Sequence, residues 1–216
     1  MTAVPTDRTA ACADVPPYFS QFVEGRRGEV LDAALCVFAE KGYNGGTMRE
    51  IASRLGVTEP ALYRHYAGKE ALFADLVALA GDHVVEQTGA MLDRVSPANL
   101  RESLAALIAM RRRPANGGRT KPIIGTLMMA APHNAAFQET FREHLARPMV
   151  ARLEALVPVV DANFGIESSV AQVRGRVRAF MSLYVGYFMT SLVFDDPSDT
   201  DEAITQAMLS IMGWDA

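Results

Sequence analysis

The pattern of apolar and polar positions predicts helices along most of the chain, and strand-like alternation is absent. The clearest helical pattern covers residues 28–41 and indicates about four turns. Its apolar residues recur at spacings of three and four: Val30, Leu31, Ala34, Leu35 and Phe38. Gly42 follows as a C-terminal stop, and Tyr43 is expected to pack against the next helices.

Residues 47–73 have the signals of two short helices joined by a tight turn. Thr47 and Glu50 form a capping-box pattern, which satisfies two backbone donors at a helix start. Gly56 stands where that helix must end, because glycine takes the left-handed conformation without strain. Thr58 is placed to cap the second helix, and Pro60 falls in its first turn. The pattern predicts a helix-turn-helix, whose second helix enters the major groove of DNA.

The remainder also reads as helical, so the predicted fold class is all-α. A helix is expected from Lys69 to about Asp93, and another after the cap-and-proline pair Ser96-Pro97. Four more are expected over residues 120–130, 134–160 (kinked near Pro148), 170–194 and 199–212.

The segment LDAALCVFAEKGYNGGTMREIASRLGVTEPALYRHYAGKEALF resembles the DNA-binding domain of the tetracycline-repressor (TetR) family of bacterial regulators. The match runs from Arg27 to Phe73 without insertion, with minor departures at Tyr66 and Gly68. The resemblance implies a three-helix DNA-binding head and a helical ligand-binding and dimerisation body. We therefore expect a flexible arm (1–24), the head (25–73) and the body (74–216).

The resemblance and the motif together assign candidate DNA contacts. Glu59, Pro60 and Ala61 begin the reading helix and should approach base edges. Tyr63, His65 and Lys69 are at positions that the family uses for backbone phosphates, and Thr47 should bind a phosphate at a helix N-terminus. The complete set of expected DNA-binding residues is Thr47, Arg49, Thr58, Glu59, Pro60, Ala61, Tyr63, Arg64, His65 and Lys69. The alternative is that Arg49, Glu59 and Arg64 are solvated surface charges.

The formal net charge of −4 does not exclude DNA binding, because phosphate contacts act locally. Residues 21–73 contain equal numbers of basic and acidic side chains, so the head is neutral and the deficit lies elsewhere. Arg49, Arg64, His65 and Lys69 gather near the reading helix. This modest cluster predicts salt-sensitive binding.

The apolar stretch 179–194 is too short for a membrane span and contains polar residues, so a buried helix is expected. With the last helix, it could pack against a two-fold copy as a four-helix bundle. The family resemblance implies the same homodimer, and two reading helices then imply a palindromic operator.

A ligand-binding pocket is expected among the methionines and aromatic residues of the body, since methionine adapts to varied apolar shapes. The plain alternative is that these residues fill a core. The candidates are Met110, Met128, Phe137, Phe141, His144, Phe180, Tyr184 and Tyr187, with His144 as a polar anchor. By resemblance, a small apolar effector would weaken DNA binding by a population shift.

No pattern in the sequence supports catalysis, a metal or a cofactor. The chain lacks a G-x-S-x-G elbow, a P-loop, a dinucleotide fingerprint and a C-x-x-C pair, and its four histidines have no metal-ligand spacing. Two cysteines are too few for a disulfide framework and suggest a reducing, cytoplasmic location. The expected function is a ligand-responsive transcription regulator, more often repressor than activator. An enzyme and a helical interaction module with a vestigial head are the alternatives.

Overall fold

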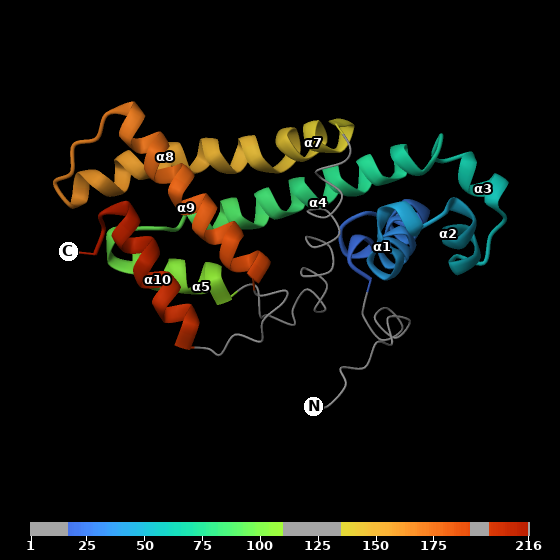
Figure 1. Cartoon of the computed structure of the whole chain (residues 1–216), viewed down its shortest axis with the longest axis horizontal. Coiled ribbons are helices and arrows are strands. Elements are labelled where there is room, and N and C mark those ends of the chain that lie inside the picture. The colour runs from blue at the N-terminus through green and yellow to red at the C-terminus, as the bar shows by residue number, and fades with distance from the viewer. Residues whose placement is uncertain (1–16, 110–134, 191–198, 216) are drawn as a thin grey trace. The chain divides into compact units, whose positions relative to one another are not determined.

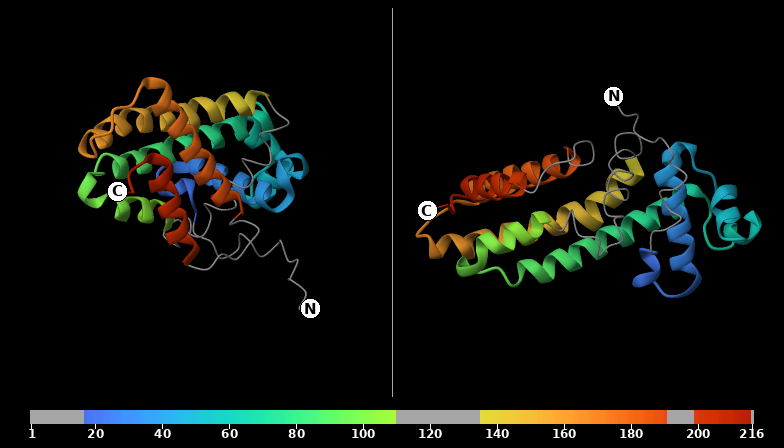
Figure 2. Two further views of the ribbon diagram at one scale, coloured as in Figure 1. Left: turned by 60° about the vertical axis from the view of Figure 1, so that its left-hand side comes forward. Right: turned by 90° about the horizontal axis from the view of Figure 1, so that it is seen from below.

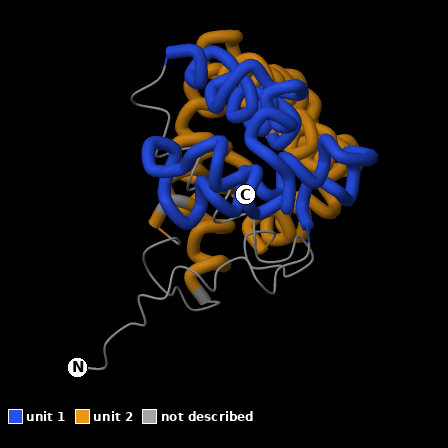
Figure 3. The backbone as a smooth tube through the Cα atoms, turned by 90° about the vertical axis from the view of Figure 1, so that its right-hand side faces the viewer, with its two compact units in different colours: residues 1–80, 113–140 blue, residues 81–112, 141–216 orange. Residues whose placement is uncertain are grey.

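The computed structural model describes residues 17–109, 135–190 and 199–215, and all its regular elements there are helices (Figure 1). The chain divides into two compact units (Figure 3). Unit 1 contains residues 1–80 and 113–140, and unit 2 contains residues 81–112 and 141–216. The all-α prediction is confirmed. The division falls at residue 80, inside a helix, rather than at the expected boundary after Phe73.

Unit 1 is built on α1 (Gly25–Gly45), α2 (Met48–Arg54), α3 (Glu59–Tyr63), the start of α4 (Lys69–Leu92) and α7 (Ala135–Phe141). Phe73 lies at the centre of its aromatic core. The Phe73 ring centroid lies 5.3 Å from that of Phe38, 4.5 Å from that of Tyr43 and 5.5 Å from that of Phe137. These rings join α1, α4 and α7, which are far apart in the sequence.

The segment before α1 packs against it, although it was expected to belong to a flexible arm. A short helix, η2 (Phe19–Gln21), buries Tyr18 and Phe19. The buried carboxylate of Asp32 accepts hydrogen bonds from the backbone N–H groups of Tyr18 (2.7 Å), Phe19 (2.8 Å) and Ser20 (3.0 Å). Asp32 therefore satisfies the donors that the start of a short helix leaves unpaired.

Gly28 lets this segment approach α1 closely. A Cβ atom at this position would lie 2.4 Å from the carbonyl oxygen of Val23 and 3.0 Å from the Cα atom of Ser20. The requirement for glycine at Gly28 is thus steric, because its φ angle is not left-handed.

Unit 2 contains the end of α4, η3 (Pro97–Asn99), α5 (Leu100–Ala109), η7 (Arg142–Ala146), α8 (Arg147–Asn163), α9 (Val170–Thr190) and α10 (Asp199–Met212). Helix α9 contacts both α8 and α10, and α10 also contacts α5 (Figures 1 and 2). Their core includes Leu104, Ile108, Val157, Phe180 and Met208. The expected ends of α4 and α10 and the cap at Ser96 are confirmed within one residue.

The kink expected near Pro148 is a turn of π-helix just before it. The N–H of Arg147 donates to the carbonyl of Arg142, which is the five-residue spacing of a π-helix. Pro148 has no N–H to offer the carbonyl of His144. That carbonyl faces α4 at Gly81, where a Cβ atom would lie 3.0 Å from the oxygen.

A buried ionic network fixes the C-terminal end of unit 2. Asp161 is 1% exposed and accepts hydrogen bonds from Arg176 and from the indole N–H of Trp214 (2.8 Å). Gly213 takes a φ of 71°, which ends α10 and turns the chain so that Trp214 folds back. Burial opposes ionisation of Asp161, but hydrogen bonds from Arg176, Trp214 and Ser168 outweigh it and lower its pKa below 3.8.

The sequence predicted no membrane span in residues 179–194 and a reducing location for the two cysteines. No helix of the described residues is long and apolar enough to cross a membrane. Cys36 is buried on α1, and the reducing location expected from the two cysteines stays a prediction. The expected helix over 120–130 lies outside the described residues.

We expect Asp161→Asn to lower the free energy of unfolding by about 2–3 kcal/mol, because it leaves the charge of Arg176 uncompensated in a nearly buried site. Urea denaturation at pH 7 measures this. The pKa of Asp161 is lowered in the folded state, so its contribution is present above pH 4 and is lost as the pH falls through the folded-state pKa. The difference between variant and wild type should therefore shrink in acid.

Glu202→Gln is the control, because the Arg101–Glu202 pair is half-exposed and should contribute little. A loss from Asp161→Asn no larger than this control's would contradict the role given to the network.

Candidate nucleic-acid interface

Helix α2 begins with the predicted capping box. The N–H of Glu50 donates to the hydroxyl of Thr47 (3.3 Å), and the carboxylate of Glu50 accepts from the N–H of Thr47 (3.1 Å). Lys41 also donates to this carboxylate, and these bonds lower the pKa of Glu50. The start of α2 is thereby held to the end of α1.

The turn between α2 and α3 has the geometry that the glycine pattern predicts. Gly56 has a φ of 67°, and the N–H of Val57 donates to the carbonyl of Ala52 (3.0 Å). Val57 is half-buried, and Thr58 makes no side-chain cap bond although it occupies the N-cap position. The two helices are therefore set by the turn itself.

Helix α3 is anchored on one face and exposed on the other. Leu62 is 1% exposed and Tyr66 is buried, whereas the ring of Tyr63 is 48% exposed. The exposed members of the predicted DNA-binding set are Thr47, Arg49, Thr58, Pro60, Tyr63, Arg64 and His65, and the half-buried ones are Glu59, Ala61 and Lys69. The structure thus gathers the predicted base-reading and phosphate-binding residues on and around α3.

Lys69 has a different environment from the other basic residues of this surface. Its ammonium donates to the carbonyls of Tyr43 (2.9 Å) and Gly46 (3.2 Å), and it lies 4.6 Å from the centroid of the Tyr43 ring. It therefore caps the carbonyl end of α1. A phosphate contact by Lys69, as predicted, would compete with these bonds.

Two acidic side chains near the helix-turn-helix, Glu40 and Glu50, are engaged by other basic residues. Glu40 accepts from Arg54 (2.7 Å), and Glu50 pairs with Lys41. Arg49 and Arg64 have no ion-pair partner among the described residues and are exposed. The guanidinium groups of these two residues are therefore available to bind an external anion.

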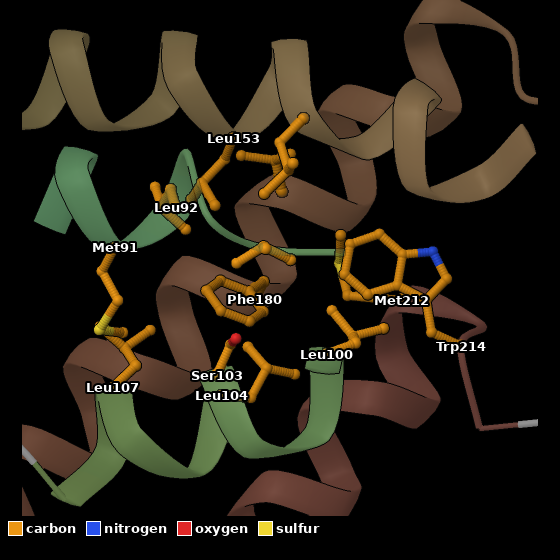
Figure 4. A pocket seen from close by; sticks show the side chains of 13 residues that line it. Met91, Leu92, Leu100, Ser103, Leu104, Leu107, Leu153, Phe180, Met212 and Trp214 are labelled. Atoms are coloured by element: carbon orange, nitrogen blue, oxygen red, sulfur yellow. The ribbon is translucent and has the colours of Figure 1, made fainter. Parts of the chain in front are cut away.

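Unit 2 contains an apolar cleft enclosed by α4, α5, α8, α9 and the C-terminal turn (Figure 4). Phe180 projects into it from α9, and Trp214 lies beside Met212 at one end. Ser103 is the only lining residue with a polar side-chain atom other than the Trp214 indole, whose N–H is bonded to Asp161. The free space is about 20 Å³, so the cleft is nearly filled by its own side chains.

The residues predicted to bind a ligand are dispersed, and only Phe180 lines this cleft. Phe137 belongs to the aromatic core of unit 1, so its placement there contradicts a role in this cleft. His144 pairs with Asp82 on α4 at 2.9 Å and does not line the cleft either. Tyr187 donates to Asp201, and Tyr184 and Phe141 lie outside the lining. Met110 and Met128 lie outside the described residues.

The cleft residues that sequence reasoning missed come mainly from ordinary helical leucines: Leu92, Leu100, Leu104, Leu107 and Leu153. Trp214 was missed as well, although a single tryptophan directly after a helix-ending glycine was a usable signal. The described residues contain no cluster of His, Cys, Asp or Glu arranged to hold a metal ion.

Residues 30–76 match the family model of bacterial regulatory proteins, tetR family. Over 60 residues the chain is 42% identical to the HTH-type transcriptional activator FasR of Mycolicibacterium smegmatis, which covers 28% of this chain and 27% of that protein. Over 55 residues it is 42% identical to the HTH-type transcriptional repressor KstR2 of Mycobacterium tuberculosis, covering 26% and 28%. The match thus spans about a quarter of these curated relatives.

Solved structures resemble the chain over most of its length. A putative transcriptional regulator from Pseudomonas aeruginosa PAO1 has a TM-score of 0.72 at 17% identity and covers 94% of this chain and 95% of that one. FadR from Bacillus subtilis, in complex with stearoyl-CoA, has a TM-score of 0.62 at 18% identity and covers 87% and 98%. At these identities the likeness shows the fold. The family match itself is confined to the helix-turn-helix region, residues 30–76.

Proposed function

We propose that this protein is a ligand-responsive transcription regulator that binds a palindromic operator, most simply as a repressor. The observation that carries the proposal is the outward face of α3. Tyr63 is a large ring left 48% exposed beside Arg64 and His65, while Leu62 and Tyr66 anchor the same helix from behind. An exposed aromatic hydroxyl amid basic groups suits a phosphate backbone.

Whether the protein represses or activates transcription stays a prediction. FasR is an activator and KstR2 is a repressor, and the two have the same identity to this head. A repressor needs only to occupy its operator, whereas an activator must also contact the transcription machinery. The simpler role is the one proposed, and acting on chromosomal DNA implies a cytoplasmic location.

The proposed regulator is a homodimer, because one α3 spans too little DNA for high specificity. Two reading helices at a separation of one helical turn would read an inverted repeat. The last two helices were predicted to form the seam. Helix α9 exposes a row of small residues at helical spacing, namely Gly175, Ala179, Ser182 and Gly186, which would allow close approach of a second copy. The exposed positions of α10 are more polar and include Glu202, Gln206 and Ser210.

The proposed effector is a small, largely apolar molecule bound in the cleft of unit 2. The lining is almost entirely apolar, and its two polar groups are already bonded outside it, Ser103 to Asn99 and the Trp214 indole to Asp161. Because the cleft is nearly filled, binding must displace side chains, and the flexible, partly buried Met91 can move at small cost. The stearoyl-CoA bound to FadR makes an acyl chain a reasonable first probe.

An effector can release DNA only if it binds the non-DNA-binding state better. We propose that filling the cleft separates helices α4, α5 and α9, which line it, and so favours that state. Catalysis is not part of this proposal, because the residues that line the cleft do not include a nucleophile paired with a general base.

The wild-type protein should bind an inverted-repeat duplex recovered by selection from random sequence, with two protomers per duplex and clear salt sensitivity. Tyr63→Ala should weaken this binding by about tenfold or more, since a hydrogen bond to a charged group contributes roughly 1.5–3 kcal/mol. Fluorescence anisotropy with scrambled competitor measures the loss. Val170→Ala, at a residue that is 68% exposed at the start of α9, is the matched control.

Unchanged operator affinity in both Tyr63→Ala and Lys69→Ala would refute the assignment of the reading helix. A wild-type protein that prefers no duplex over scrambled DNA would refute the regulator itself.

Stearoyl-CoA should change the fluorescence of the purified protein in a saturable way, because Trp214 is the single tryptophan and lines the cleft. Coenzyme A without the acyl chain should not. Leu104→Phe should weaken the response to stearoyl-CoA severalfold, because the larger side chain fills the remaining space of the cleft.

Leu183→Phe is the control, because Leu183 packs against the core of unit 2 without lining the cleft. If Leu104→Phe and Leu183→Phe respond to stearoyl-CoA like the wild type, the effector binds elsewhere.

A further inference from the structure

A second feature of unit 1 lies beside the reading helix and was not assigned from the sequence. It is a cleft of about 330 Å³ between the start of α1 and the residues that follow α3. Its lining consists of Arg26, Arg27, Val30, His65, Tyr66 and Asp75. Three of these six side chains are basic or can become so, and one is acidic.

The acidic member, Asp75, is engaged within the cleft. Its carboxylate accepts two hydrogen bonds from the guanidinium of Arg27, with Nε at 3.0 Å, and one from the hydroxyl of Tyr66 at 2.7 Å. Burial raises the pKa of Tyr66, and the bond to Asp75 raises it further, so the hydroxyl stays protonated as a donor. Asp75 therefore offsets one cation and leaves the cleft with a positive balance.

The other cations of the cleft can be reached by an external anion. The fork to Asp75 uses Nε and Nη2 of Arg27, and Arg27 also interacts with the Tyr66 hydroxyl. Its side chain is nevertheless 54% exposed, so an external anion can reach Nη1 of its guanidinium. Arg26 pairs with Glu29 at 2.5 Å, but their side chains are 53% and 50% exposed, and such a surface pair contributes little. Arg26 can exchange Glu29 for a more strongly charged partner, and His65 is exposed at the opposite wall.

We propose that this cleft binds a phosphate of the DNA backbone beside the bases that α3 reads. Arg26 and the Nη1 group of Arg27 supply the charge from α1, and His65 supplies a donor from the segment after α3. His65 follows Tyr63, the last residue of α3, by two positions, so an anion in the cleft lies next to the reading helix. The proposal rests on the regulator function and extends its DNA contacts to α1.

Phosphate is the ligand that this geometry favours. Guanidinium groups match phosphate oxygens through paired N–H donors, and the already bonded Asp75 holds one of the guanidinium groups in place. The DNA backbone also suits an open cleft. Neighbouring contacts between α3 and the same DNA would hold the phosphate in place even though the cleft does not enclose it. A phosphate contact of this kind adds affinity without reading the base sequence.

The test compares wild type, Arg26→Gln and Arg101→Gln on the selected operator and on a scrambled duplex over a series of KCl concentrations. Arg26→Gln keeps most of the side chain and removes one charge from the cleft. Arg101→Gln removes one charge from a similarly exposed ion pair in unit 2. Fluorescence anisotropy gives the affinity, and the slope of log affinity against log salt counts the phosphate contacts.

Arg26→Gln should weaken binding severalfold and by the same factor on both duplexes. It should also reduce the salt slope by roughly 0.9, the value of one phosphate contact. Arg101→Gln should match the wild type in both quantities. Circular dichroism should show an unchanged fold for Arg26→Gln, because its side chain is half-exposed.

A wild-type slope and affinity for Arg26→Gln, with Tyr63→Ala still impaired, would overturn this inference and leave the regulator function standing. The same result joined to a melting temperature that rises with inorganic phosphate in the wild type, but not in Arg26→Gln, would assign the cleft to a free anion instead. If the wild type prefers no duplex, both the regulator function and this inference fail.

Discussion

One carboxylate on α4 connects the elements on which the reading helix depends. Asp75 is bonded to Arg27 near the start of α1 and to Tyr66 just after α3, and its side chain is only 20% exposed. Helix α3 has five residues, which is too short to be stable alone. Its orientation therefore comes from Leu62 and Tyr66 packing beneath it and from the link through Asp75. The outward residues Tyr63, Arg64 and His65 inherit that orientation.

The body is organised by a second buried carboxylate. Asp161 joins α8 to Arg176 on α9 and to Trp214 beyond α10. Trp214 and Met212 form one end of the apolar cleft, so the network holds the wall against which a ligand would press. The end of the cleft at Trp214 and Met212 is fixed, whereas the end at Met91 can adapt. A cleft built in this way could open for an apolar molecule and then close around it.

The two kinds of comparison differ for a physical reason. Sequence identity of 42% is confined to the head, whereas a likeness of fold at 17% identity covers 94% of the chain. A helix-turn-helix depends on particular caps, a glycine turn and a few side chains at fixed positions. A helical body depends on apolar packing, which many combinations of residues of suitable volume can satisfy. Relatives are therefore more informative about the sequence of the head than about that of the body.

The head was predictable because its signals are local. The capping box at Thr47 and Glu50 and the positive φ of Gly56 each depend on residues within one helical turn.

Long-range partners could be decided only by the tertiary structure. Asp32 and Asp161 look like ordinary helix-surface acids in the sequence, yet each is buried and accepts bonds from residues 12 to 53 positions away. Lys69 donates to a carbonyl near the end of α1, and His144 pairs with Asp82, and neither partner could be predicted from the sequence. Helical periodicity indicates which face of a helix is buried, but a hydrogen bond also needs a partner's position, and that position exists only once the helices have packed.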